Sequence, residues 1–329
     1  MFAYIVRRVL YMIPTLFAIS ILSFIIIQLP PGDFLTSYVA QLRQMGDQVD
    51  EAQLESLRVR YGLGEPVYVQ YGKWVWGILS RGDWGQSFEL QKPVNQLIWE
   101  RVWLTVLISG AALLVSWFIA IPVGVYSATH QYSWLDYLVT GFSFVGLGTP
   151  GFLLALVVLF YAQSWLGLNV GGLFSEEYLM APWSWGKVVD LLQHIWIPLI
   201  IVAFGSTAGN IRITRANLLD ELNKPYVETA RAKGVGENKL IWKYPVRVAL
   251  NPFFSTVGWS LAALVSGTTL VSVVLSLQTT GPMMLRALTS QDMYLAGSFL
   301  FLLSTLTVIG TLISDILLAV VDPRIRLGD

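Results

Sequence analysis

One polar segment stands out in a chain that is otherwise strongly apolar. It consists of Tyr226, Val227, Glu228, Thr229, Ala230, Arg231, Ala232, Lys233 and Gly234. Pro225 suits a first helical turn, and Asn223 before it can cap a helix. Glu228 and Lys233 place charges of the favourable sign near the two helix ends, and Gly234 permits a left-handed stop. The segment therefore predicts a short surface helix, which could serve for docking.

A second helix is predicted directly after the first, roughly from Glu237 to Lys243 and ending before Pro245. In the first helix, Ala230 and Ala232 would keep the profile slim enough to enter a cleft of another protein. Composition alone would also allow a plain amphipathic surface helix. The residues by themselves leave docking and surface coverage both open.

Several kinds of chemistry are excluded or disfavoured. The chain has no cysteine, which excludes disulfides, thiolate metal sites and a cysteine nucleophile. His130 and His194 are the only histidines and are too isolated for a histidine metal centre. No GxxxxGK[ST] phosphate loop is present, so ATP hydrolysis by that route is excluded. A formal net charge of zero gives no sign of a nucleic-acid partner. We therefore expect no enzyme activity, no cofactor and no metal in this chain.

The composition predicts an all-α integral membrane protein. Hydrophobic residues make up 55%, charged residues only 13%, and the mean hydropathy is +0.60, whereas soluble domains carry about a quarter charged residues. Arg7 and Arg8 precede an uncharged run longer than a signal-peptide core, which predicts a retained first helix. Windows long enough to cross the bilayer predict six transmembrane helices near 9–29, 103–125, 137–162, 194–214, 254–277 and 295–320.

Lysine and arginine in the short connections predict the orientation. The connection after the fourth span carries Arg212, Arg215, Lys224, Arg231, Lys233, Lys239, Lys243 and Arg247. The connections after the third and fifth spans carry only Lys187 and Arg286. Basic residues also flank the first and last spans. Both termini and a loop at 215–250 are therefore expected on the cytoplasmic side.

Three regions follow: residues 1–30, an extracytoplasmic region at 31–102, and a five-helix core with the cytoplasmic loop at 103–329. In the middle region, Asp50 and Gln53 can cap a helix that stops at Gly62. A second helix is expected between Pro66 and Gly82, with Val67, Tyr71, Trp74 and Ile78 on one face. These helices could cover a channel mouth or receive a substrate-carrying partner, and the sequence leaves both roles open.

Ionisable residues are scarce within the predicted spans. Asp315 lies near the cytoplasmic edge, and we interpret it as a pairing or capping carboxylate rather than a proton relay. His194 is expected at the outer interface. Stripes of small residues predict close helix packing, and glycine with proline predicts bends in the third and fourth spans. The residues concerned are Gly110, Ala111, Ala112, Gly258, Ala262, Ala263, Ser266, Gly267, Gly146, Gly148, Pro150, Gly151 and Pro198.

The polar segment also carries a family resemblance. Glu228-Thr-Ala-Arg-Ala-Lys-Gly234 followed by Arg247-Val-Ala-Leu-Asn-Pro252 resembles the EAA loop of bacterial ABC-transporter permeases. The order of further motifs resembles the B-type subunit of the dipeptide/oligopeptide/nickel permease family over nearly the whole chain. These motifs are Pro31-Gly-Asp33, Tyr61–Pro66, Gln70-Tyr71, Trp74, Gly82–Ser87, Pro93-Val94, Asp315 and Asp322–Arg326.

The resemblance implies a type I ABC importer permease in the bacterial inner membrane, with 226–234 as the helix that docks on an ATPase. It further implies a second homologous permease subunit, two ATP-binding subunits that hold ATP and Mg, and an extracytoplasmic substrate-binding protein. Peptides are the expected cargo. Oligosaccharides are the alternative, nickel is disfavoured, and a stand-alone secondary transporter or channel is the alternative of another class. Two stretches depart from the family pattern: Ser276–Pro282 and Tyr244-Pro245.

Overall fold

The computed structural model describes residues 2–28, 59, 65–87, 89–167 and 170–321. Within these residues the regular elements are α-helices, and one isolated bridge joins Gln86 to Pro93. The predicted all-α fold is confirmed. Apart from Val59, the helix expected between Asp50 and Gly62 lies outside the described residues, as do Pro31–Asp33 and Asp322–Arg326.

Four long helices coincide with four of the predicted spans. They are α1 (Phe2–Gln28), α5 (Val94–Thr129), α9 (Trp185–Leu222) and α17 (Met293–Val321), and each is long and apolar enough to cross a membrane. At a rise of about 1.5 Å per residue, α5 and α9 are each more than 50 Å long, against about 30 Å for the hydrocarbon core. These two helices therefore reach well beyond the core. Pro122 and Pro198 lie inside them without ending them.

The span predicted at 137–162 is a bent pair. Helix α6 (Trp134–Gly148) and α7 (Gly151–Leu166) meet at an angle of 100°. Proline lacks an N–H and disfavours helical backbone in the residue before it, and Thr149 before Pro150 is indeed extended. The nitrogen and hydroxyl of Thr149 both donate to the Val145 carbonyl, at 2.9 and 2.7 Å. The break expected from glycine and proline is confirmed.

The span predicted at 254–277 is not one continuous helix. The chain there forms α13 (Asn251–Ser255), α14 (Val257–Gly267) and α15 (Thr269–Val274). Gly267 lowers helix propensity at the second break, and the Thr256 hydroxyl at the first bonds back to the Pro252 carbonyl at 2.7 Å. Sequence hydropathy merges these pieces because it does not detect helix breaks. The six predicted spans thus correspond to four continuous helices, one bent pair and one interrupted segment.

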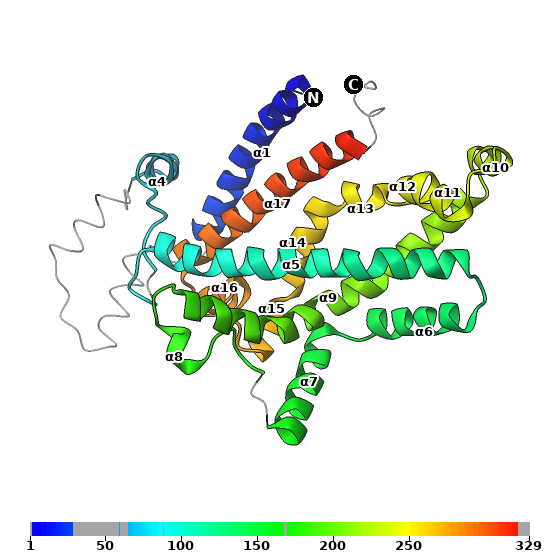
Figure 1. Ribbon diagram of the computed structural model, residues 1–329. Helices are drawn as coiled ribbons and strands as arrows, with labels where there is room; N and C mark the ends of the chain where they lie inside the picture. Colours follow the sequence, from blue (N-terminus) through cyan, green and yellow to red (C-terminus); the bar gives the residue numbers. More distant parts are fainter. Residues whose placement is uncertain (1, 29–58, 60–64, 88, 168–169, 322–329) are drawn as a thin grey trace.

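The molecule has two ends, which we name after their helices (Figure 1). The α4 end holds α4 (Val67–Arg81), α8 (Glu176–Leu179) and α16 (Thr280–Thr289), and the α10 end holds α10 (Pro225–Ala232), α11 (Glu237–Lys243) and α12 (Pro245–Ala249). The start of α1 lies beside the end of α17, where Arg8 pairs with Asp315 at 3.1 Å.

Helix α4 matches its prediction closely. Gly82 ends it with a left-handed φ of +64°, and Trp74 is buried against Phe24 of α1 and Phe301 of α17. The Tyr71 hydroxyl lies 2.7 Å from that of Ser20. The predicted buried face is confirmed for Tyr71, Trp74 and Ile78, which pack in one hydrophobic cluster. Val67 is exposed because it lies in the first turn of α4, outside the contact with α1 and α17.

Helices α5 and α9 pack side by side and form the centre of the fold. A Cβ atom on Gly124 would lie 2.6 Å from the Thr214 Cβ, so glycine is required for this approach. Deeper in the pair, the Asn210 amide donates to the Ser116 hydroxyl at 2.9 Å. Because both helices run from the α4 end to the α10 end, they connect the two ends physically.

Candidate functional site

The predicted surface helix is present as α10. Pro225 occupies its first turn, Lys224 caps it with extended backbone, and Gly234 follows with φ +74°. The start and the glycine stop are confirmed, but the expected capping role of Asn223 is wrong. That residue ends α9 instead, and its amide donates to the Leu219 carbonyl at 3.3 Å, because α9 continues to within two residues of Pro225.

Two faces of α10 differ sharply in exposure. Val227 and Ala230 are buried and pack against Leu240 of α11, with Val235 and Tyr244 beside them. The outward face carries Tyr226, Glu228, Thr229, Arg231, Ala232, Lys233 and the exposed Gly234. The prediction that Ala230 and Ala232 both enter a cleft of another protein is wrong for Ala230, because this residue packs against its own chain. Ala232 faces outward.

Polar contacts join α10 to its neighbours. The Tyr226 hydroxyl donates to Glu221 Oε2 at 2.6 Å in the last turn of α9. The pKa of Tyr226 is raised well above its usual value, mainly because the side chain is partly buried and secondly because of this hydrogen bond. Arg231 donates to both oxygens of Glu237 on α11, from Nη2 at 2.7 Å and from Nε at 3.2 Å. This bonding lowers the pKa of the Glu237 carboxyl.

Buried contacts continue from α11 toward the membrane helices. Val246 and Ala249 of α12 pack in one cluster with Leu218 of α9 and Val125 of α5. The Asn217 amide also donates to the Ala249 carbonyl at 3.4 Å. A displacement of α10 would therefore reach α9 and α5 through packed side chains. The expected departure from helix at Tyr244-Pro245 is a break between α11 and α12.

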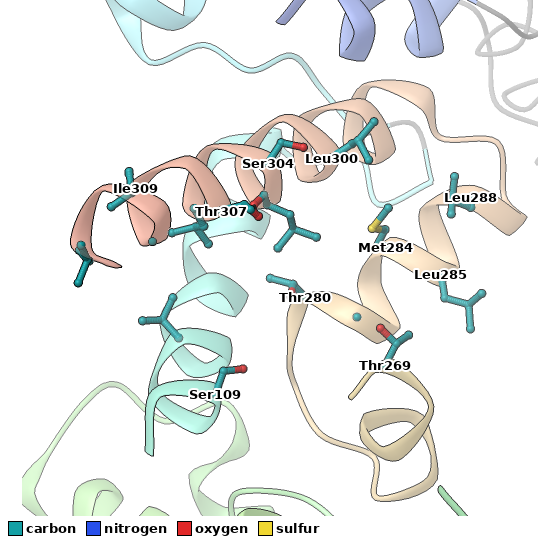
Figure 2. Close-up of a pocket in the computed structure, with 16 residues that line it drawn as sticks. Ser109, Thr269, Thr280, Met284, Leu285, Leu288, Leu300, Ser304, Thr307 and Ile309 are labelled. Carbon is teal, nitrogen blue, oxygen red and sulfur yellow. Dashed lines mark hydrogen bonds between the residues drawn. The ribbon is translucent and has the colours of Figure 1, made fainter. Parts of the chain in front are cut away.

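A membrane cavity of about 600 Å³ lies between α5, α15, α16 and α17 (Figure 2). Its lining is apolar with five hydroxyls and no charged side chain: Val106, Ser109, Thr269, Thr280, Gly281, Met284, Leu285, Leu288, Leu300, Leu303, Ser304, Leu306, Thr307, Ile309, Gly310 and Ile313. Figure 2 shows Ser109 on α5 across the cavity from Thr269 and Thr280. Such a space suits an uncharged or backbone-like part of a small molecule.

Sequence reasoning missed this cavity because four elements far apart in the chain contribute to it. One signal was available on α17, where Leu300, Leu303, Ser304 and Thr307 recur at helical spacing and mix hydroxyls with leucine. The departure at Ser276–Pro282 leads into the same place. Ser276 has φ +53°, α16 begins at Thr280, and Thr280 and Gly281 line the cavity.

The ionisable groups of the spans lie away from the cavity lining. Asp315 pairs with Arg8, as the pairing interpretation predicts. His194 Nδ1 lies 2.8 Å from the Asp190 carbonyl, two to three turns into α9 at the α4 end. Within the described residues, neither group belongs to the cavity lining.

Comparison with known proteins identifies relatives over the whole chain. Residues 120–327 match the binding-protein-dependent transport system inner membrane component, and residues 1–109 match the N-terminal model for such a membrane component. The oligopeptide transport system permease protein AppB of Bacillus subtilis is 36% identical over 99% of this chain and 100% of its own. The dipeptide transport system permease protein DppB of Alkalihalophilus pseudofirmus is 30% identical, with the same coverage.

A solved structure supports the same fold. The MetNI methionine ABC transporter in an inward-facing conformation matches with a TM-score of 0.53 and 17% identity, over 69% of this chain and 97% of that chain. Full-length relatives and this shared helical fold agree with the geometry above. The chain therefore belongs to the family of binding-protein-dependent transport system inner membrane components.

Proposed function

We propose that the chain is a membrane-spanning permease subunit of an ATP-driven importer of peptides. Its full-length relatives include permease proteins of oligopeptide and dipeptide transport systems. The observation that carries the proposal is the construction of α10. One face is anchored by Val227 and Ala230, while the other presents charged and small residues to the outside. A helix anchored in this way can transmit force from a partner without carrying catalytic groups.

In the proposed assembly, two ATP-binding subunits hold ATP and Mg, and one of them docks on the segment Tyr226–Gly234. A second homologous permease completes the pathway, and an extracytoplasmic binding protein delivers the peptide to the region at 31–102. The chain would lie in the bacterial inner membrane with both termini and α10 in the cytoplasm. Basic residues near α10 and at both termini support that orientation.

The proposed coupling is a two-state mechanism. ATP binding must favour one arrangement of the permease through contacts that differ between the two states. Helix α10 packs against α11, and α12 packs against α9 and α5. Because α5 also lines the cavity through Val106 and Ser109, movement at α10 can alter access to it.

Other functions have less support. A stand-alone secondary transporter needs an intramembrane charge relay, whereas the described cavity lining is uncharged. An oligosaccharide importer would share the same machinery, and the names of the relatives favour peptides over sugars.

Docking is tested with the double variant E228A/G234V in the assembled complex. Glu228 is exposed, and Gly234 has open space around it but a positive φ that disfavours side chains. We expect normal membrane insertion, loss of copurifying ATP-binding subunits and loss of peptide-dependent ATP hydrolysis.

The matched control is E177A/G167V, which makes the same two kinds of change away from α10. Glu177 is exposed, and Gly167 has φ +63° with open space around it. This control should retain the ATP-binding subunits. Full retention of those subunits by E228A/G234V would contradict docking through α10, and uptake of peptide by the chain without partners would contradict the importer proposal.

A further inference from the structure

A half-buried arginine, Arg101, lies near the start of α5 and has no hydrogen-bonded anion among the described residues. Arg101 forms no hydrogen bond or ion pair through its guanidinium among the described residues, and the charged groups that influence it electrostatically are Glu100 and Arg286. Glu100 is the next residue along the helix and is exposed, so it projects from a different direction. Arg286 adds a second positive charge rather than a counterion.

Glu89 and Asp292 form hydrogen bonds to other groups, and among the described residues the second Glu89 oxygen, Oε2, is buried without a hydrogen-bond partner. Glu89 Oε1 accepts from Arg286 Nε at 2.6 Å, and Asp292 accepts from the Ser87 hydroxyl at 2.5 Å and from the Leu295 nitrogen at 3.3 Å. Arg286 already has Glu89 as its counterion, whereas a partly desolvated guanidinium without a hydrogen-bonded anion, such as that of Arg101, is unfavourable. Arg101 therefore has both the charge and the free hydrogen-bond donors to receive an anion.

Arg101 also belongs to a polar stripe that leads to the membrane cavity. Arg101, Thr105 and Ser109 follow one another at four-residue spacing, which places them along one side of α5. The Thr105 and Thr280 hydroxyls lie 3.1 Å apart, and the Thr280 nitrogen donates to Thr105 Oγ1 at 2.9 Å. Ser109 and Thr280 line the cavity. Along the helix axis, Arg101 lies about 12 Å from Ser109, toward the α4 end.

The cavity and the arginine complement each other chemically. A peptide offers neutral amide groups, which suit the hydroxyl-bearing cavity, and a terminal carboxylate, which an uncharged lining cannot neutralise. A guanidinium binds a carboxylate through two parallel hydrogen bonds. We propose that Arg101 binds the terminal carboxylate of the peptide where it enters the cavity, and so selects substrates that carry a free carboxylate. This inference rests on the proposed peptide import.

The test uses the complete complex in proteoliposomes and compares uptake of trialanine with uptake of trialanine amide. The variant R101Q should lower specific uptake of trialanine about tenfold or more, as expected for a lost hydrogen bond to a charged group. Uptake of the amide should not change. R101K keeps the charge but loses the two-point geometry, so its uptake should fall between that of the wild type and that of R101Q. R81Q removes an exposed arginine at the same end and should match the wild type.

A chemical rescue distinguishes charge from packing. The chain contains no cysteine, so R101C introduces its single thiol. Reaction with an aminoethyl thiosulfonate should restore trialanine uptake, whereas a neutral reagent of equal length and a sulfonatoethyl reagent should not. The wild-type complex treated with each reagent controls for thiols in the other subunits.

Equal loss of trialanine and amide uptake in R101Q, or equal rescue by the neutral reagent, would show a structural role and overturn the carboxylate inference. Wild-type uptake of trialanine with an unchanged R101Q would overturn that inference and leave peptide import standing. No ATP-dependent uptake of any peptide by the wild-type complex would overturn the proposed function and this inference together.

Discussion

Arg215 and Asp136 form a two-point ion pair that holds α6 against α9. Arg215 Nε lies 2.8 Å from Asp136 Oδ1, and Arg215 Nη2 lies 2.9 Å from Asp136 Oδ2. Asp136 is almost wholly buried and also accepts from the Ser127 hydroxyl and, at 3.0 Å, from the Tyr132 nitrogen. Because Arg215 lies two turns before the end of α9, this pair links the α5–α6 turn to the helix that leads into α10.

We expect R215A to destabilise the protein strongly, because it leaves a buried carboxylate without its cation. Breaking such a pair typically costs about 3–5 kcal/mol, and R215A/D136A should cost less than the two single changes together. Thermal unfolding of the purified protein in detergent measures the midpoints. The control R231A removes an ion pair of similar geometry between exposed groups and should change the midpoint little. Equal midpoints for R215A and R231A would contradict a structural role for the buried pair.

A pair of alanine substitutions separates the two faces of α10. A230L places extra volume against Leu240 and should loosen α10 from α11, since overpacking typically costs about 1–3 kcal/mol. A232L adds the same atoms to the exposed face and should leave folding intact while obstructing docking. Hydrogen exchange across residues 225–243 reports the first effect, and copurification of ATP-binding subunits reports the second. If A232L retains those subunits, the docking surface lies elsewhere.

Acid should weaken the contact between α10 and α11. Hydrogen bonds from Arg231 lower the pKa of Glu237 in the folded protein, so its stabilising contribution is fully present above the unfolded pKa of about 4.3. That contribution is lost as the pH falls through the lower folded value. Exchange rates in α10 and α11, corrected for their intrinsic pH dependence, should begin to rise as the pH falls below about 5 and should keep rising through the folded pKa of Glu237. E237Q lacks this ionisation and should show a flatter profile, and identical profiles would contradict the assignment.

Local signals in the sequence predict the helix ends well. Gly82 and Gly234 both have the left-handed backbone that their positions suggest, and Pro225 begins α10 as expected. α11 runs over its expected bounds, Glu237 to Lys243. These features depend on residues within one or two turns, so a single chain without tertiary information is enough to predict them.

Features that depend on distant contacts are not predictable in this way. The burial of Val227 and Ala230 on α10 depends on contact with Leu240 of α11. The cavity is assembled from four helices that are far apart in the chain. Ser133 caps the helix that contains Asp136, and its sequence position suggests this local role. The sequence near Asp136 does not indicate that its ion-pair partner is Arg215, which lies 79 positions further along the chain. Arg101 merely borders the uncharged span in sequence. That its guanidinium has no hydrogen-bonded carboxylate among the described residues becomes visible only when the surrounding helices are in place.

Gly258 should be indispensable for the crossing of α14 and α17. A Cβ atom there would lie 2.3 Å from the Thr311 nitrogen and 2.4 Å from the Gly310 carbonyl carbon, and backbone atoms cannot move aside as a side chain can. G258A should therefore force the two helices apart and lower both the yield and the thermal midpoint of the protein. Gly267 lies in the same helix with nothing within 4 Å of an added Cβ, so G267A makes the identical change without a clash. Because the added Cβ would meet no atom, G267A should match the wild-type midpoint. Equal midpoints for the two variants would mean that the crossing can relax, and that the small residues predicted in this span serve some purpose other than close packing.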